Sequence, residues 1–419
     1  MVDELDSIDS FVPGRGEFFC RGCLGKNLFS GLNLGQLPIA NELLLTPDSR
    51  NDSYPLHLRI CSDCGLGQVA DVVTPDRIFR NYRYLSSMST TFLSHAAEFV
   101  NEVLNESAYQ PEEWVLEIAS NDGYLLKNFL PHKIKVIGIE PAENVAQISR
   151  NLGIETIAEF FSSELAREIL LKHGYPKLII ANNVMAHVPD LVDFIEGLSI
   201  LAGPNTKISI ENPSLANILI DLQFDTVYHE HYSYLSAFTV NNLCKNVGLN
   251  LVSVEKLSTH GGSNRYTLAR KTAPGNLVQS FIEQEIDFGL FSPISWEQYA
   301  IKVNHVLLEL TRWFTIERNS LHKVYGYGAA AKASTLLNSI PIRHGDLKAI
   351  ADVSYEKQGR YMPNTGIEII SPEQLINESP TDILIFPWNI KVEILEFLKS
   401  NLNDTVRYWC PIPEMHEIK

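Results

Sequence analysis

The fold of this chain follows from one stretch, WVLEIASNDGYLL, at residues 114–126. Its first six residues are mostly apolar and have the length of a short buried strand. The next four, Ser-Asn-Asp-Gly, are turn-forming residues, because they bond the local backbone or accept unusual dihedral angles. An aromatic residue and two leucines then open a helix. The stretch predicts a strand, a tight turn and a helix in direct succession.

Similar units follow along the chain. Residues 135–139 are a second apolar run, which ends at Glu140 and leads into a helical pattern. Residues 177–181 are a third run, with Asn182 and Asn183 at its carboxyl end. Strands that alternate with helices indicate a doubly wound parallel sheet. Because ligands bind beyond the carboxyl ends of such strands, these polar residues mark a binding edge.

The position of Glu140 indicates the kind of ligand. A carboxylate at the end of the second strand can accept both hydroxyl groups of a ribose. The first turn, however, reads Glu-x-Ala-x-Asn-Asp-Gly and lacks the Gly-x-Gly-x-x-Gly pattern that approaches a diphosphate. This favours a nucleoside without a diphosphate, such as S-adenosylmethionine, over NAD. A Rossmann-like fold without such a ligand is the alternative, since fold does not fix function.

A second α/β unit begins near residue 324, after a largely helical segment at residues 275–320. Residues 324–328 read VYGYG, and glycines at this place let a backbone approach an anion at a helix start. Asp352 ends the next apolar run. The pattern predicts a C-terminal Rossmann-like domain. The alternative is that this domain is only a scaffold.

Four of the six cysteines form two Cys-x-x-Cys pairs separated by 37 residues. In a reducing cytosol this spacing indicates a metal rather than disulfides. Four thiolates suit tetrahedral Zn²⁺ and leave no open position. We therefore predict a closed structural zinc site made by Cys20, Cys23, Cys61 and Cys64. The alternatives are four unpaired buried cysteines, or His57 as a rival ligand.

Length and charge limit the class of protein. A chain of 419 residues exceeds one ordinary core, so two or three domains are expected. The formal net charge of -16 argues against broad binding to nucleic acid or anionic membranes. The sequence has no membrane-length apolar run, and its first residues lack the features of a signal peptide. We expect a cytoplasmic protein with no nucleic-acid or membrane partner.

The densest chemistry lies at residues 228–234, which read YHEHYSY. Imidazole titrates near physiological pH, a carboxylate can raise its basicity, and tyrosine hydroxyls can hold a developing oxyanion. His187 follows the third strand run. Such a cluster suits proton abstraction beside a carbonyl, although it equally suits a metal or a structural role.

With these motifs assembled, the chain resembles the sugar C-methyltransferases, which methylate a keto nucleotide sugar. The shared features are the two cysteine pairs, the Glu-x-x-Ser-Asn-Asp-Gly turn, the Tyr-His-Glu-His-Tyr run and the Gly-Tyr-Gly-Ala-Ala-x-Lys opening of the last domain. They extend over nearly the whole chain. The resemblance implies S-adenosylmethionine as donor, zinc in the N-terminal domain, and a nucleotide-linked 4-keto sugar of dTDP, GDP or CDP type as acceptor. We expect a monomer.

The resemblance also implies roles for particular residues. Its catalytic positions map onto Tyr82, His187, Tyr228, Glu230 and His231. Its donor-binding positions map onto Glu117, Ser120, Asn121, Gly123 and Glu140. Tyr84 is an alternative to Tyr82, and Ala119 stands where many methyltransferases have glycine.

The expected chemistry is methylation of the carbon beside a ketone. We predict that His231 removes the proton from this carbon, with Glu230 supporting it. The enolate would accept hydrogen bonds from His187, Tyr228 or Tyr82 and attack the methyl group. In the last domain, the lysine and serine of the sequence AKAS at residues 331–334 are expected to contact phosphate.

The predicted fold is α/β with three domains: a small zinc-binding domain at residues 1–75, a central doubly wound methyltransferase domain at residues 76–275, and a C-terminal Rossmann-like domain at residues 276–419. Three alternatives stay open. They are an O- or N-methyltransferase acting on a sugar, a zinc-containing scaffold with a decayed methyltransferase site, and a nicotinamide oxidoreductase that uses residues 326–332 and Asp352.

Overall fold

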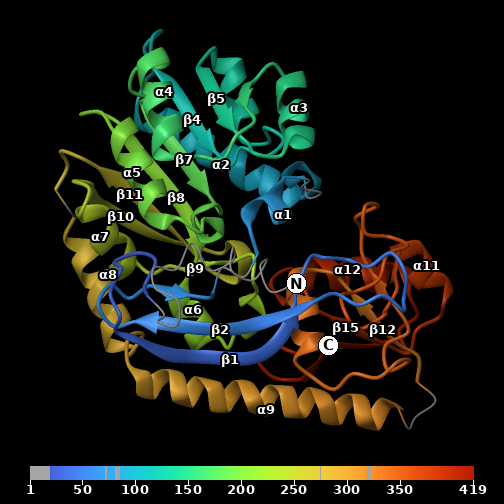
Figure 1. The fold of residues 1–419 in the computed structure, drawn as a ribbon. Coiled ribbons are helices and arrows are strands. Elements are labelled where there is room, and N and C mark those ends of the chain that lie inside the picture. Colours follow the sequence, from blue (N-terminus) through green and yellow to red (C-terminus); the bar gives the residue numbers. More distant parts are fainter. Residues whose placement is uncertain (1–18, 71–72, 81–84, 274, 319–321) are drawn as a thin grey trace, which may run out of the picture.

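The computed structural model describes residues 19–70, 73–80, 85–273, 275–318 and 322–419. They form three β-sheets with helices packed around them (Figure 1). The chain is α/β, as predicted. Tyr82 and Tyr84 lie outside the described residues. Within the part of the chain that the structure describes, no helix is both long and apolar enough to cross a membrane.

The N-terminal sheet has four antiparallel strands, in the order β1 (Leu28–Pro38), β2 (Ser53–Cys61), β3 (Gly67–Gln68) and β9 (Ser233–Tyr234). Leu56, Leu58 and Ile60 alternate along β2 and are buried, as the two-residue period of a strand requires. β9 comes from the middle of the chain and pairs with β3. The end of the histidine-rich run therefore belongs to the N-terminal sheet, which the sequence did not predict.

The central sheet has seven strands. Their spatial order is β10 (Asn250–Leu257), β11 (Ser263–Ala269), β8 (Lys207–Pro213), β7 (Leu178–Asn182), β4 (Trp114–Ile118), β5 (Lys135–Ile139) and β6 (Glu155–Ile157). All pairs are parallel except those that β11 makes with β8 and β10. The chain runs from β4 outward to β6 and then returns to β7 on the other side of β4. This reversal is the switch point where such sheets bind ligands.

Helices cover both faces of this sheet (Figure 1). They are α2 (Thr90–Glu106), α3 (Glu143–Asn151), α4 (Ser163–His173), α5 (Leu191–Leu201), α7 (Ala237–Lys245) and α8 (Asn276–Asp287), with the short α1 (Pro75–Phe79) before them. α6 (Leu215–Ile220) instead packs in the core that the N-terminal sheet shares with other parts of the chain. Trp114, Leu116 and Ile118 share one core with α4 and α5, whereas Val115 shares another core with α2. The side chains of β4 are thus buried on both faces of the sheet, which explains its nearly continuous apolar sequence.

The C-terminal sheet has six strands, in the order β14 (Ile369–Ile370), β13 (Ile350–Ala351), β12 (Val324–Tyr327), β15 (Asp382–Ile385), β16 (Arg407–Cys410) and β17 (His416–Ile418). Its first five strands are parallel, and β17 is an antiparallel edge strand. Its helices are α10 (Ala331–Asn338), α11 (Pro372–Asn377) and α12 (Lys391–Asn401). The turn after β12 stands at the switch point of this sheet.

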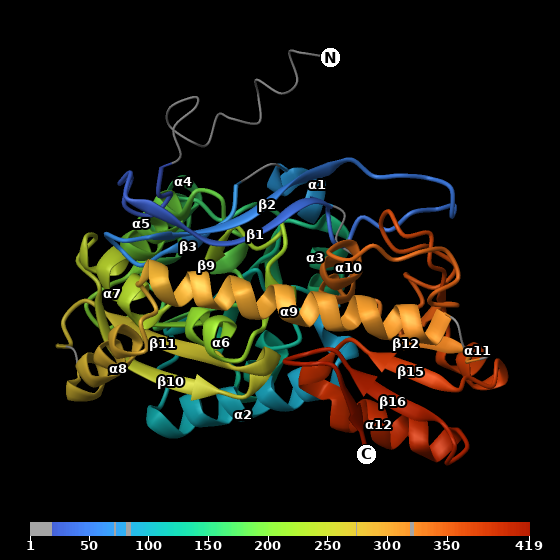
Figure 2. The same cartoon turned by 90° about the horizontal axis from the view of Figure 1, so that it is seen from below.

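The long helix α9 (Pro293–Arg318) connects the N- and C-terminal parts. It lies along β1 and reaches the C-terminal sheet (Figure 2). Trp296, Tyr299 and Phe314 are buried in a core that also contains residues of β2 and α10. The N-terminal sheet, α9 and the C-terminal part therefore share one continuous apolar core.

Candidate active site

The turn after β4 has an unusual backbone. Ala119, Asn121 and Gly123 have positive φ angles of 56°, 50° and 80°. Ala119 thus adopts a left-handed conformation that glycine accepts more easily. A Cβ atom on Gly123 would lie 2.7 Å from Ile154 and 2.8 Å from Ser149, so the position requires glycine. These constraints fix the turn at the carboxyl end of β4.

Glu140 ties this turn to the second strand. One carboxylate oxygen accepts a hydrogen bond from the Asn121 N–H at 3.1 Å, and the other from the Ala142 N–H at 2.9 Å. Burial raises the pKa of Glu140 to about 6, and these two N–H groups oppose the shift. Each oxygen keeps a second lone pair. Glu140 can therefore still accept hydrogen bonds from ribose hydroxyls.

Several buried oxygens at this edge of the sheet have no hydrogen-bond partner among the described residues. They are Glu117 Oε2, Ser120 Oγ, Asp122 Oδ1, Asn182 Oδ1 and Asn183 Oδ1. Burial, with the carboxylates of Asp122 and Glu140, raises the pKa of Glu117 well above its usual range. An unpaired buried polar atom costs about 1–3 kcal/mol. A ligand with several hydrogen-bond donors and a positive charge, as S-adenosylmethionine has, fits these residues.

The segment before α2 covers the turn. In η2 (Ser86–Met88), the backbone N–H of Ser86 donates to Asn121 Oδ1 at 2.9 Å. The predicted catalytic Tyr82 and its alternative Tyr84 precede this contact and lie outside the described residues. Their roles stay predictions.

Tyr228 and His231 form a hydrogen-bonded pair. The Tyr228 hydroxyl lies 2.8 Å from His231 Nε2, and His231 Nδ1 lies 3.2 Å from the carbonyl oxygen of Thr226. Because a carbonyl only accepts, Nδ1 carries the proton of the neutral ring, and Nε2 accepts from the phenol. The ring centres are 4.1 Å apart. This geometry suits proton transfer from the phenol oxygen to the imidazole.

His187 lies beside this pair, in η4 (Met185–His187) after β7. Its Nδ1–H donates to the Glu230 carbonyl oxygen at 2.7 Å, and its ring centre is 4.7 Å from that of His231. Burial lowers the pKa of His187 to about 4, so the ring is neutral near pH 7. Its Nε2 then carries a lone pair. His187 therefore offers a hydrogen-bond acceptor at Nε2, and not the donor to an enolate that the sequence predicted.

The Glu230 carboxylate is directed toward the N-terminal part. Its Oε1 accepts hydrogen bonds from the backbone N–H and the side-chain amide of Asn41, each at 3.0 Å. Burial raises the pKa of Glu230, and the Asn41 groups oppose this. The two ring nitrogens of His231 contact Tyr228 and Thr226, and the support of His231 by this carboxylate stays a prediction. Glu230 holds His187 through its backbone carbonyl.

The other side chains of the run are bonded to the N-terminal part. The Nε2 of His229 lies 3.3 Å from the Tyr54 carbonyl oxygen. The Tyr232 hydroxyl donates to the Val73 carbonyl oxygen at 2.7 Å. These contacts place the run between the N-terminal sheet and the switch point of the central sheet.

Two similar backbone turns bring the cysteines together. In each, the first cysteine carbonyl accepts from the residue four positions later, Leu24 at 2.8 Å and Gly65 at 2.9 Å. Both Leu24 and Gly65 have positive φ, at 61° and 76°. The two Cys-x-x-Cys pairs therefore fold as knuckles, as the spacing predicts.

The sulfur atoms of the four cysteines fit a zinc ion. The Sγ atoms of Cys20 and Cys64 are 3.4 Å apart, those of Cys23 and Cys61 are 3.6 Å apart, and all four lie within 4.8 Å of one another. Tetrahedral zinc with Zn–S bonds of about 2.3 Å sets sulfur atoms about 3.8 Å apart. The rival ligand His57 instead contacts Ser30 Oγ at 2.8 Å.

The glycine-rich turn of the C-terminal sheet is filled by side chains of the protein. A Cβ atom on Gly328 would lie 2.2 Å from Pro387. Lys332 Nζ lies 3.9 Å from the centre of the Trp388 ring and donates to Asn389 Oδ1 at 2.9 Å. The predicted phosphate ligand Ser334 is only 1% exposed. This turn is packed against protein where a dinucleotide would need access.

Asp352, which would hold a ribose in an oxidoreductase, is also occupied. Its carboxylate accepts a hydrogen bond from Lys357 Nζ at 3.2 Å. The same Nζ donates to the Ala329 carbonyl oxygen at 2.9 Å, across the mouth of the glycine turn. The nicotinamide alternative therefore gains no support.

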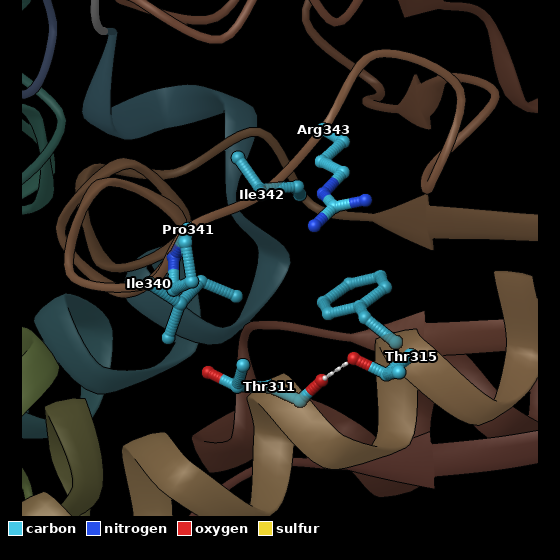
Figure 3. A pocket seen from close by; sticks show the side chains of 7 residues that line it. Thr311, Thr315, Ile340, Pro341, Ile342 and Arg343 are labelled. Atoms are coloured by element: carbon cyan, nitrogen blue, oxygen red, sulfur yellow. Dashed lines mark hydrogen bonds between the residues drawn. The ribbon is translucent and has the colours of Figure 1, made fainter.

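A small pocket lies elsewhere, between α9 and the loop after α10 (Figure 3). Thr311 and Thr315 line it, but their hydroxyls donate to carbonyl oxygens of α9 itself. Arg343 is the charged residue of its lining. The pocket shares no residue with the predicted site.

Three family models match the chain. A zinc-binding domain matches residues 20–79, a methyltransferase domain matches residues 92–254, and a C-methyltransferase C-terminal domain matches residues 258–413. C-methyltransferase NovU from Streptomyces niveus is 30% identical over 403 residues, which are 94% of this chain and 95% of that protein. Together with the switch point and its acidic turn, these matches define an S-adenosylmethionine-dependent methyltransferase with a zinc-binding domain.

The chain belongs to the C-methyltransferase family, because this relative is matched over nearly its whole length. O- or N-methylation and a decayed scaffold are not what this family indicates. Two solved structures that the chain resembles have lower identity to it. A methyltransferase from Anabaena variabilis is 16% identical, with 42% of this chain and 85% of that chain covered and a TM-score of 0.33. Magnesium protoporphyrin IX methyltransferase from Synechocystis with bound SAH is 14% identical, with 43% and 85% covered and a TM-score of 0.34.

Sequence reasoning missed the residues that hold the catalytic run in place. Asn41 bonds Glu230 from 189 positions away, and Thr226 orients His231. Asn41 gives no signal of its own, since it is one polar residue in a loop. Thr226 stands two positions before the run, so its proximity in the sequence was the one available sign.

Proposed function

We propose that the protein methylates the carbon beside the ketone of a nucleotide-linked 4-keto sugar. The observation that carries this proposal is the pair of Tyr228 and His231 beside the neutral His187. These groups stand at the same end of the sheet as the acidic turn. A carbon acid needs both a proton acceptor and stabilisation of the enolate. The cluster offers proton acceptors on two imidazole rings, those of His231 and His187.

The chemistry divides among the residues as follows. The Tyr228 oxygen takes the proton from the substrate carbon while its own proton moves to His231 Nε2, because the two atoms already share a hydrogen bond. The resulting imidazolium stays beside the enolate and stabilises its charge. S-adenosylmethionine, when bound, supplies a methyl group on a sulfonium. The carbon–carbon bond forms as the carbon–sulfur bond breaks, and His231 keeps the proton until it is released to solvent.

The donor and the metal have separate sites in this proposal. Glu117, Ser120, Asn121, Gly123 and Glu140 hold the donor, and the four cysteines hold zinc as a structural ion. Tyr82 contacts the acceptor. Glu230 and His229 exclude water by anchoring the run to the buried side of the N-terminal sheet, which protects the enolate from reprotonation.

Incubation of the protein with keto nucleotide sugars in D₂O tests the proposal. Without donor, the carbon beside the ketone should exchange its proton for deuterium. With donor, mass spectrometry should find one added methyl on the same carbon. A methyl ether without prior exchange would contradict the enolate route, and a product that lacks the nucleotide would contradict the substrate class.

A further inference from the structure

Residues 225–228 connect the catalytic pair, of which Tyr228 is a member, with the C-terminal domain. Their contacts alternate along the chain. Thr226 and Tyr228 face His231, through the Thr226 carbonyl at 3.2 Å and the Tyr228 hydroxyl at 2.8 Å. Asp225 and Val227 face the C-terminal domain. Each residue that contacts His231 is therefore next in sequence to a residue that contacts the C-terminal domain.

Two hydrogen bonds make the contact with the C-terminal domain. The indole N–H of Trp388, in η7 (Trp388–Ile390), donates to Asp225 Oδ2 at 2.8 Å. The hydroxyl of Thr335, in α10, donates to the Val227 carbonyl oxygen at 3.3 Å. Asp225 is 1% exposed and Thr335 is 2% exposed, so water does not replace either bond readily.

Asp225 depends on this contact. Its second oxygen, Oδ1, is buried without a hydrogen-bond partner among the described residues. Lys332 lies over the ring of Trp388 and attracts the carboxylate electrostatically. Backbone N–H groups of Asp225 and Thr226 also support this carboxylate. Loss of the Trp388 N–H would remove the hydrogen bond that ties it to the C-terminal domain, which is unfavourable for a buried carboxylate.

The position of the Thr226 carbonyl decides where His231 carries its proton. With the carbonyl in place, the proton sits on Nδ1, and Nε2 accepts from the Tyr228 hydroxyl. If the carbonyl moves away, the ring loses its preference for this tautomer. With the proton on Nε2, the Tyr228 hydroxyl would accept from the ring instead of donating to it, and the relay could not start.

We propose that Thr335 and Trp388 are positioning residues, through which the C-terminal domain fixes the tautomer of His231 for the proton transfer described under the proposed function. The inference rests on that function for its kinetic consequence only. The tautomer itself is a property of the protein without substrate. The C-terminal domain is then a part of the catalytic apparatus.

The direct test is NMR of the full chain labelled with ¹⁵N at histidine. A His231→Gln variant identifies the His231 signals. In the unaltered protein, Nδ1 should appear protonated and Nε2 unprotonated. In the double variant Thr335→Val with Trp388→Phe, the two nitrogen signals should move toward averaged values. Unchanged signals in this folded variant would overturn the inference.

The kinetic test uses matched variants. Thr335→Val removes the hydroxyl at nearly constant volume and should lower kcat about 3- to 10-fold, from the usual contribution of one hydrogen bond. Thr335→Ser keeps the hydroxyl and should retain kcat. Trp313→Phe is the control for Trp388→Phe, because the Trp313 Nε1 has no hydrogen-bond partner among the described residues. The KM for S-adenosylmethionine should stay unchanged in all of them.

The outcomes separate the two proposals. If no keto nucleotide sugar is exchanged or methylated but the tautomer is fixed and then lost in the double variant, the proposed function fails and the positioning role stands. If methylation occurs and Thr335→Val and Thr335→Ser lower kcat equally, the positioning role fails and the function stands. Should the double variant not fold, Thr335→Val alone is used for both the NMR test and the kinetic test.

Discussion

Replacement of Tyr228 by phenylalanine removes one hydroxyl from the centre of the proposed site. The ring that packs on His231 at 4.1 Å is kept, so the local structure should survive. The loss is the 2.8 Å hydrogen bond to His231 Nε2. A neutral buried hydrogen bond contributes about 1 kcal/mol to stability, which a chain of this size tolerates.

The effect on the reaction should be far larger than the effect on stability. A positioned acid–base group accelerates proton transfer about 10²- to 10⁴-fold. At about 1.4 kcal/mol for each factor of ten, this corresponds to about 3–5 kcal/mol of the barrier. Tyr228→Phe should therefore lower the rate of deuterium exchange and the rate of methyl transfer together, by at least about 100-fold.

Tyr234→Phe is the matched control. Its hydroxyl accepts from the Tyr228 backbone N–H at 3.2 Å but makes no hydrogen bond to His231, and the residue is buried whereas Tyr228 is half-buried. Calorimetric binding of S-adenosylmethionine should be the same in both variants. Retention of more than a third of the exchange rate by Tyr228→Phe would refute the relay, and His187 would then be the base to test.

Three further outcomes follow from the structure. Glu140→Gln should weaken donor binding about 10- to 100-fold, since hydrogen bonds to a charged group contribute about 1.5–3 kcal/mol. Burial raises the pKa of Glu140 to about 6, so the unaltered protein should lose affinity for the donor as the pH falls below about 6. The affinity of the variant should not change with pH in this range. Gly123→Ala should lower the free energy of unfolding by about 1–3 kcal/mol in urea, because its Cβ would lie 2.7 Å from Ile154; full stability would contradict the close approach. Cys23→Ser should lower the zinc content found by metal analysis below one ion per chain and lower the Tm, whereas Cys244→Ser should leave the zinc content unchanged.

Much of the fold could be predicted because its signals are local. The apolar run before Ser120 and the turn residues up to Gly123 lie within one short stretch, and strand, turn and helix each have a period that such a stretch displays. The cysteine knuckles are equally local. Chemistry at a strand exit, as at Glu140, is predictable because the sheet itself places it.

The partners of the catalytic run could not be predicted in this way. Asn41 reaches Glu230 across 189 positions, and Trp388 reaches Asp225 across 163 positions. A hydrogen bond between such residues depends on how three sheets pack, and neither residue carries a periodic signal. The Glu230 carboxylate is an example, because it is bonded by Asn41 although His231 follows it in the sequence.

The pairing of β9 with β3 has a consequence for how the chain matures. β1, β2 and β3 are synthesised well before β9, so their sheet keeps an open edge until residues 233–234 follow. An unpaired edge strand invites aggregation, and domains generally fold from the N-terminus during synthesis. Zinc can therefore stabilise the knuckles of the nascent chain well before the catalytic run closes the sheet. Assembly of the active site then coincides with protection of that edge, so a nascent chain that stalls before residue 233 is both inactive and exposed.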